Sequence, residues 1–88
     1  MTRQEIFDYL SDRNLIQDNK HVILVDGFEN AFLGVTAIKP IKVIYDYWAC
    51  LDILVQREKM DFDNAMDSLE EFIEQDLGEF TPLYIKLI

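Results

Sequence analysis

The middle of the chain constrains the fold most, because it breaks the helical pattern of the segments on either side. β-Branched and aromatic residues dominate the stretch HVILVDGFENAFLGVTAIKPIKVIYDY, and Asp26-Gly27 and Lys39-Pro40 divide it into three short runs. These runs predict strands at about residues 22–25, 32–38 and 41–46. The connections between them are short, which favours antiparallel neighbours.

A helix is expected before this block. Thr2 followed by Glu5 forms a capping box, in which the hydroxyl and the carboxylate each satisfy an N–H at the start of a helix. The pattern predicts a helix over residues 3–13, and Asn14 is a plausible left-handed stop.

Two helices are expected after it. Asp46 is the candidate N-cap of a helix over residues 47–58, whose main apolar stripe would contain Trp48, Leu51 and Val55. Asp61 is the candidate N-cap of the next helix, and Gly78 is expected to end it.

The last segment is expected to close the sheet. Thr81-Pro82 blocks further helix, and the alternation in LYIKLI predicts a strand. The order α-β-β-β-α-α-β predicts an α+β fold with two layers, in which about three helices pack on a mostly antiparallel sheet of about four strands. A chain of 88 residues can bury one core, so residues 1–88 are expected to form a single domain.

The third predicted helix is amphipathic and acidic. At about 100° per residue, its apolar side chains occupy one arc that would face the sheet. A separate arc that would face water holds five carboxylates, those of Asp63, Asp67, Glu70, Glu71 and Glu74. Like charges at this spacing repel each other, and those near the C-terminal end oppose the helix dipole.

The charge is distributed unevenly. The net charge is −9; residues 1–59 hold nine acids and seven Lys or Arg, whereas residues 60–88 hold eight acids and only Lys86. Such a chain would be repelled by nucleic acid and would attract a basic protein surface. Two interpretations of the acidic face stay open: a solvated face that aids solubility, or a contact surface for a basic partner.

Catalytic and metal-binding patterns find little support, so a non-enzymatic protein without metal or cofactor is expected. Asp26 follows an apolar run as some nucleophiles do, but Phe28 replaces the second aspartate of that pattern, and Asp26-Gly27 is better explained as a turn. His21 has no neighbouring ligand and is interpreted as a polar residue at a strand edge, and Cys50 as buried apolar filler.

Three segments resemble short proteins of tailed bacteriophages: VDGFENAFLGV, VIYDYWACLDILVQREKMDFDNAMDSLEEFI and GEFTPLYI, within about residues 22–85. The AIKPIK segment differs from the longer polar turn of those proteins. The resemblance implies a small protein that binds and redirects host machinery, and a location in the host cytoplasm. No apolar run is long enough to span a membrane, which agrees with that location.

The sequence therefore predicts an acidic phage interaction protein. The five carboxylates of the third helix would steer association with a basic host or phage protein, and an aromatic residue such as Phe80 or Tyr84 would supply an apolar anchor. A DNA mimic that inhibits a host nucleic-acid or defence enzyme is the sharpest form of this hypothesis. The alternative is a self-associating module, possible as a homodimer, in which the LYIKLI edge pairs between copies.

Overall fold

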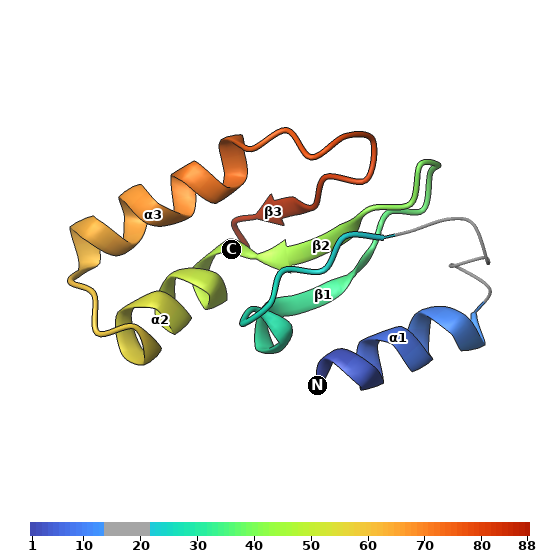
Figure 1. The fold of residues 1–88 in the computed structure, drawn as a ribbon, viewed down its shortest axis with the longest axis horizontal. Helices are drawn as coiled ribbons and strands as arrows, with labels where there is room; N and C mark the ends of the chain where they lie inside the picture. Colours follow the sequence, from blue (N-terminus) through green and yellow to red (C-terminus); the bar gives the residue numbers. More distant parts are fainter. Residues whose placement is uncertain (14–21) are drawn as a thin grey trace.

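A mixed three-stranded sheet lies at the centre of the computed structural model, which describes residues 1–13 and 22–88 (Figure 1). Strand β2 (Val43–Asp46) lies between β1 (Phe32–Val35), to which it is antiparallel, and β3 (Leu83–Ile85), to which it is parallel. The parallel pairing arises because the chain crosses back through two helices after β2. The fold is α+β as predicted, with one strand fewer than expected among the described residues.

The predicted strand at residues 22–25 is the missing one. These residues are half-buried but form no strand in the described structure, and the Val25 N–H donates to the Tyr45 hydroxyl, at 2.8 Å, instead of to a neighbouring strand. A turn at Asp26-Gly27 and the short 3-10 helix η1 (Glu29–Ala31) then lead into β1. His21 and its predicted strand-edge position lie outside the described residues.

Helix α1 (Arg3–Asp12) begins with the predicted capping box. The Thr2 hydroxyl accepts from the Glu5 N–H at 3.1 Å, and the Glu5 carboxylate accepts from the Thr2 N–H at 2.9 Å. Its Tyr9 ring meets the Phe32 ring of β1 edge-on, with centroids 6.1 Å apart. The expected stop at Asn14 lies outside the described residues.

Helix α2 (Tyr47–Arg57) begins where predicted but faces the core differently. The Asp46 side chain accepts from the N–H groups of Trp48 and Ala49, which confirms it as the N-cap. Its buried side chains are Tyr47, Cys50, Leu51 and Leu54. Leu51 is buried as predicted, but the placement of Trp48 in the apolar stripe was wrong, because Trp48 is 46% exposed and its indole donates to the Leu87 carbonyl at 2.9 Å.

Helix α3 (Phe62–Glu74) has its predicted start and an earlier end than predicted. The Asp61 carboxylate accepts from the Asn64 N–H at 2.8 Å, so Asp61 is the N-cap. The helix stops at Glu74 because Gln75 is extended, with φ −65° and ψ 128°. Gly78 adopts positive φ, +98°, as expected, but in a separate turn beyond the helix.

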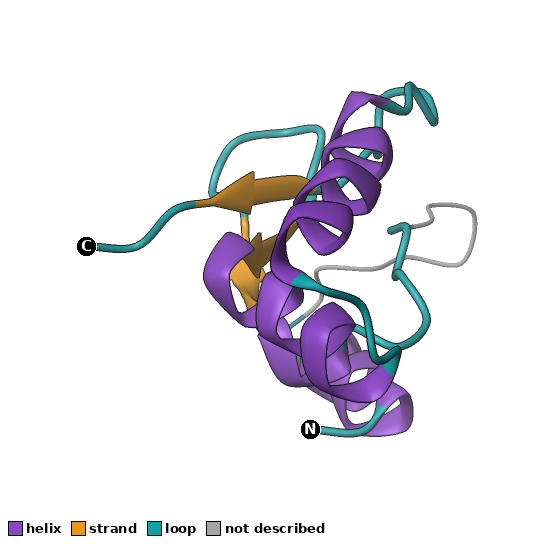
Figure 2. Ribbon diagram, turned by 90° about the vertical axis from the view of Figure 1, so that its left-hand side faces the viewer, coloured by secondary structure: helices purple, strands orange, loops and turns teal. Residues whose placement is uncertain are grey.

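The core lies between the sheet and the pair formed by α2 and α3. Figure 1 shows these two helices together at one end of the molecule and α1 towards the other end, and Figure 2 shows the C-terminal tail projecting away from the helices. One cluster of buried side chains joins the elements: Phe28, Ala31, Val43, Tyr45, Tyr47, Cys50, Leu51, Leu54, Ala65 and Leu69. This packing fixes which face of α3 points outward.

Candidate functional site

The outer face of α3 carries the predicted row of carboxylates. All five lie exposed on the helix: Asp63, Asp67, Glu70, Glu71 and Glu74. Asp63, Asp67, Glu70 and Glu74 follow one another at steps of three or four residues, about 4.5–6 Å along the helix axis, and Glu71 lies beside Glu70. We call these five residues the acidic row.

Cations near the acidic row are scarce. Lys86, the one Lys or Arg after residue 60, places its Nζ 4.6 Å from the centroid of the Tyr47 ring and 5.8 Å from that of Trp48, on α2. Within residues 1–13 and 22–88 the one ion pair joins Arg3 to Asp26. The last turn of α3 also has no basic residue. In the described structure, therefore, no salt bridge neutralises the row.

The apolar side of α3 is less buried than predicted. Ala65 and Leu69 are buried in the core, but Phe62 is 57% exposed and Ile73 is 36% exposed. The expectation that the whole apolar arc faces the sheet was therefore wrong: the buried residues lie in the middle of α3, and apolar side chains towards both ends are exposed. Phe62 and Ile73 lie within about 20° of each other around the helix, directly beside the acidic row.

The two aromatic residues proposed as anchors lie in different surroundings. Phe80 is half-buried in the turn that follows α3. Tyr84 is half-buried in β3 and stacks on Tyr45, with ring centroids 5.7 Å apart, and its burial raises the pKa of its hydroxyl. Tyr84 is therefore part of the packing between β2 and β3.

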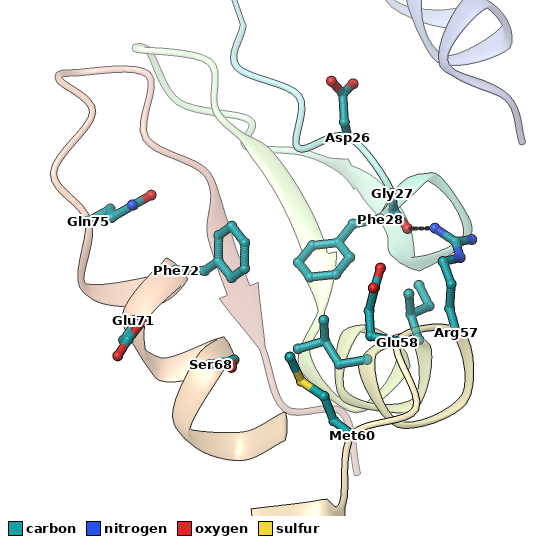
Figure 3. Close-up of a pocket in the computed structure, with 12 residues that line it drawn as sticks. Asp26, Gly27, Phe28, Arg57, Glu58, Met60, Ser68, Glu71, Phe72 and Gln75 are labelled. Carbon is teal, nitrogen blue, oxygen red and sulfur yellow. Dashed lines mark hydrogen bonds between the residues drawn. The ribbon is translucent and has the colours of Figure 1, made fainter. Parts of the chain in front are cut away.

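A cavity of about 340 Å³ borders the acidic row on the side opposite to Phe62 and Ile73. It is an open pocket bordered by the turn at residues 26–28, the end of α2 and the side of α3 (Figure 3). Phe28 and Phe72 form its apolar wall, their rings meeting edge-on with centroids 5.7 Å apart. Three carboxylates, those of Asp26, Glu58 and Glu71, and one guanidinium, that of Arg57, also line it. We call it the Phe28–Phe72 pocket.

The Asp26-Gly27 turn forms one edge of this pocket. Gly27 has φ +97°, its N–H donates to the Glu29 carboxylate at 3.0 Å, and its carbonyl accepts from Arg57 Nη1 at 2.8 Å. A Cβ at residue 27 would lie 3.2 Å from that same Nη1. The turn predicted from Asp26-Gly27 is thus confirmed; the positive φ favours glycine there, and a Cβ would also displace the end of the Arg57 side chain slightly.

Cys50 is fully buried on the inner face of α2, which confirms its interpretation as an apolar filler. Burial raises the pKa of its thiol to about 12, so the reactive thiolate is disfavoured. In the described part of the chain no three His, Cys, Asp or Glu side chains come together as a metal site would require. The helices of those same residues include none long and apolar enough to cross a membrane.

The acidic row was found from sequence, but the Phe28–Phe72 pocket was not. Its walls come from residues far apart in the chain, such as Gly27 and Arg57, and no local pattern links them. The one available signal was the turn itself, which exposes a carbonyl at the end of an apolar run.

No family model, no curated protein and no solved structure matches this chain. The resemblance to phage proteins stays a prediction, and the function has to be argued from the residues described above.

Proposed function

We propose that this protein binds a basic surface of another protein through the acidic row of α3. The observation that carries the proposal is the exposure of all five carboxylates while Lys86, the one Lys or Arg after residue 60, lies over the Tyr47 and Trp48 rings. An uncompensated negative surface attracts a basic partner over a distance of about 8 Å at physiological ionic strength and speeds encounter.

The energetics of α3 support this assignment. Carboxylates three or four residues apart repel each other, at ~0.2–0.5 kcal/mol per pair, and α3 has no lysine between them to offset that cost. Glu70, Glu71 and Glu74 also lie near the negative end of the helix dipole. A basic partner would relieve both unfavourable terms on binding.

Charge at the edge of an interface gives specificity and a fast association rate more than affinity, so the contact needs an apolar component as well. Phe62 and Ile73 are exposed beside the row, and Phe80 lies in the turn just after α3. We assign these side chains to the same contact surface, with Phe80 at its C-terminal edge.

The resemblance to phage proteins supports a host or phage protein as the partner, met in the host cytoplasm, and a role without catalysis. The sharpest form of the proposal is a DNA mimic that occupies the basic groove of a host nucleic-acid or defence enzyme, with the row in the place of backbone phosphates. In that case duplex DNA and this protein would compete for the partner, and a competition titration measures this directly.

The experiment that tests the proposal is a pull-down from bacterial lysate at low and high salt with the wild-type protein and two variants. One carries Asp67→Asn, Glu70→Gln and Glu74→Gln in the row. The matched control loses the same charge elsewhere, through Asp8→Asn, Asp12→Asn and Asp52→Asn, all exposed positions on α1 and α2.

The proposal expects a basic protein that is captured by the wild type and the control at low salt, released at high salt and lost from the row variant. If all three proteins capture the basic protein equally, the row is not the contact surface and serves only solubility. Equal loss from both variants would show that net charge, and not the position of the row, decides binding.

A second candidate function is self-association, because one observation favours it. Strand β3 is an edge of the sheet and leaves apolar side chains uncovered: Leu83 and Ile85 are each 44% exposed, and Leu87 is 46% exposed. Such an edge can pair with a second copy. Light scattering tests this, since a dimer whose mass is insensitive to salt and falls to a monomer with Leu83→Lys and Ile85→Lys would favour self-association.

A further inference from the structure

The Phe28–Phe72 pocket combines an apolar wall with a negative rim. Phe28 is 3% exposed and Phe72 is 39% exposed, and Met60, which also lines the pocket, is half-buried. The volume of about 340 Å³ lies within the range of about 300–1,000 Å³ typical of pockets that hold a ligand group. The pocket is therefore large enough to receive a long side chain.

The charges at the rim are unequal. Arg57 directs its Nη1 to the Gly27 carbonyl at 2.8 Å, and Asp26 forms its ion pair with Arg3. Glu58 and Glu71 remain, and neither takes part in an ion pair within the described residues. The Arg57 guanidinium keeps its positive charge when it donates to a carbonyl, so the two remaining carboxylates leave the rim with one net negative charge.

The two remaining carboxylates differ in direction. Figure 3 shows the Glu58 side chain extending toward the Asp26-Gly27 turn, beside the Phe28 ring, whereas Glu71 points away from the rings to the outer surface of α3. Glu58 is thus the carboxylate that belongs to the pocket itself. Glu71 belongs to the acidic row and connects the row to the pocket.

We propose that the pocket receives a lysine or arginine side chain of the basic partner, with its aliphatic stem against Phe28, Phe72 and Met60 and its charged head at Glu58. Charge complementarity selects this occupant: an acidic group would be repelled by the rim, and a purely apolar one would leave the carboxylate without a partner. The inference rests on the proposed function, to which it adds an anchor next to the acidic row.

The test is an NMR titration of the labelled protein with the peptide acetyl-Gly-Lys-Gly-amide and with the same peptide acetylated at the lysine Nζ. The lysine head is charged at neutral pH, because its usual pKa is about 10.4, and acetylation removes that charge while keeping the stem. The charged peptide is expected to shift the amide signals of Gly27, Phe28 and Phe72. The acetylated peptide is expected to bind at least about threefold more weakly.

Two variants make the test specific. Glu58→Gln is expected to weaken binding of the charged peptide about two- to fivefold. Ser68→Phe, on the pocket wall contributed by α3, is expected to fill the space and abolish the amide shifts that the peptide causes. Unchanged amide dispersion in β1 and β2 checks that both variants fold. The control with Asp8→Asn, Asp12→Asn and Asp52→Asn is expected to bind the peptide as the wild type does.

Absence of pocket shifts, or equal binding of the charged and acetylated peptides, would overturn this inference. With either result the proposed function would still stand, provided that the row variant loses its partner in the pull-down. Conversely, a row variant that keeps its partner refutes the proposed function whatever the peptide does.

Discussion

The Nζ of Lys86 lies 4.6 Å from the centroid of the Tyr47 ring, so the one Lys or Arg that follows residue 60 is held over an aromatic side chain of α2. A cation over an aromatic face gains about 0.5–1 kcal/mol at an exposed site. This contact explains how the C-terminal segment can contain a lysine and still present the acidic row of α3 without compensation. The proposed function depends on that separation.

Neutralising the acidic row is expected to stabilise the fold. Replacing Asp67, Glu70 and Glu74 by their amides removes several repulsive pairs and is expected to raise the free energy of unfolding by ~1 kcal/mol at low salt. The gain should shrink as salt is added, because salt screens exposed charges. Urea unfolding at two salt concentrations measures both effects, and a row variant less stable than the wild type would show that these carboxylates support the fold.

Two of the three glycines at positive φ allow a matched comparison. Gly27 and Gly78 have nearly equal φ, +97° and +98°, but a Cβ at residue 27 would meet Arg57 Nη1 at 3.2 Å whereas nothing lies within 4 Å of one at residue 78. Gly78→Ala is expected to cost ~1 kcal/mol from backbone strain alone, and Gly27→Ala more. Thermal unfolding compares them, and equal losses would mean that the Arg57 contact contributes nothing.

The N-cap of α3 gives a third prediction. Because the Asp61 carboxylate accepts from the Asn64 N–H at 2.8 Å, Asp61→Ala is expected to lower the free energy of unfolding by ~1 kcal/mol. Asp63→Ala, which removes the same charge in the first turn of the helix, serves as the control and is expected to change stability less. If the two variants lose the same free energy of unfolding, the cap hydrogen bond is not what stabilises the start of the helix.

Buried Cys50 gives a pH prediction. Burial raises the pKa of its thiol from 9.0 to about 12, so between these values the unfolded chain releases a proton that the folded chain retains. Stability is therefore fully present below about pH 9 and declines as the pH rises towards 12. The pKa of Tyr45 and that of Tyr84 are also raised by burial and add to the decline.

Chemical unfolding measured across this pH range tests the assignment with Cys50→Ala as the comparison. The variant is expected to lose stability less steeply than the wild type above about pH 9, because it lacks the buried thiol. An unchanged slope would assign the alkaline loss of stability to the tyrosines alone.

Local signals in the sequence predicted the features that depend on residues close together in the chain, above all the helix caps. The Thr2–Glu5 capping box and the caps at Asp46 and Asp61 are interactions over two or three residues, and the structure contains all three. The outward direction of the acidic row followed from helical periodicity. These features depend little on the remainder of the chain.

Features that depend on competing side-chain bonds or on tertiary contacts were predicted less well. The helix ended before Gly78 because local side-chain bonds compete with it: Asp76 accepts from the Gly78 N–H, and Thr81 accepts from the Leu77 N–H. Trp48 is exposed, and its indole donates to the carbonyl of Leu87, a residue 39 positions away that the local helical pattern does not include. The Phe28–Phe72 pocket needs three separate segments, so no single stretch of sequence indicated it.

The most direct test of the account is the affinity of the captured basic partner for two variants of equal net charge, one altered at Asp67, Glu70 and Glu74 and the other at Asp8, Asp12 and Asp52. We expect the dissociation constant to rise about tenfold or more for the first variant and less than about twofold for the second. Equal dissociation constants for the two variants would contradict the assignment of the acidic row as the contact surface.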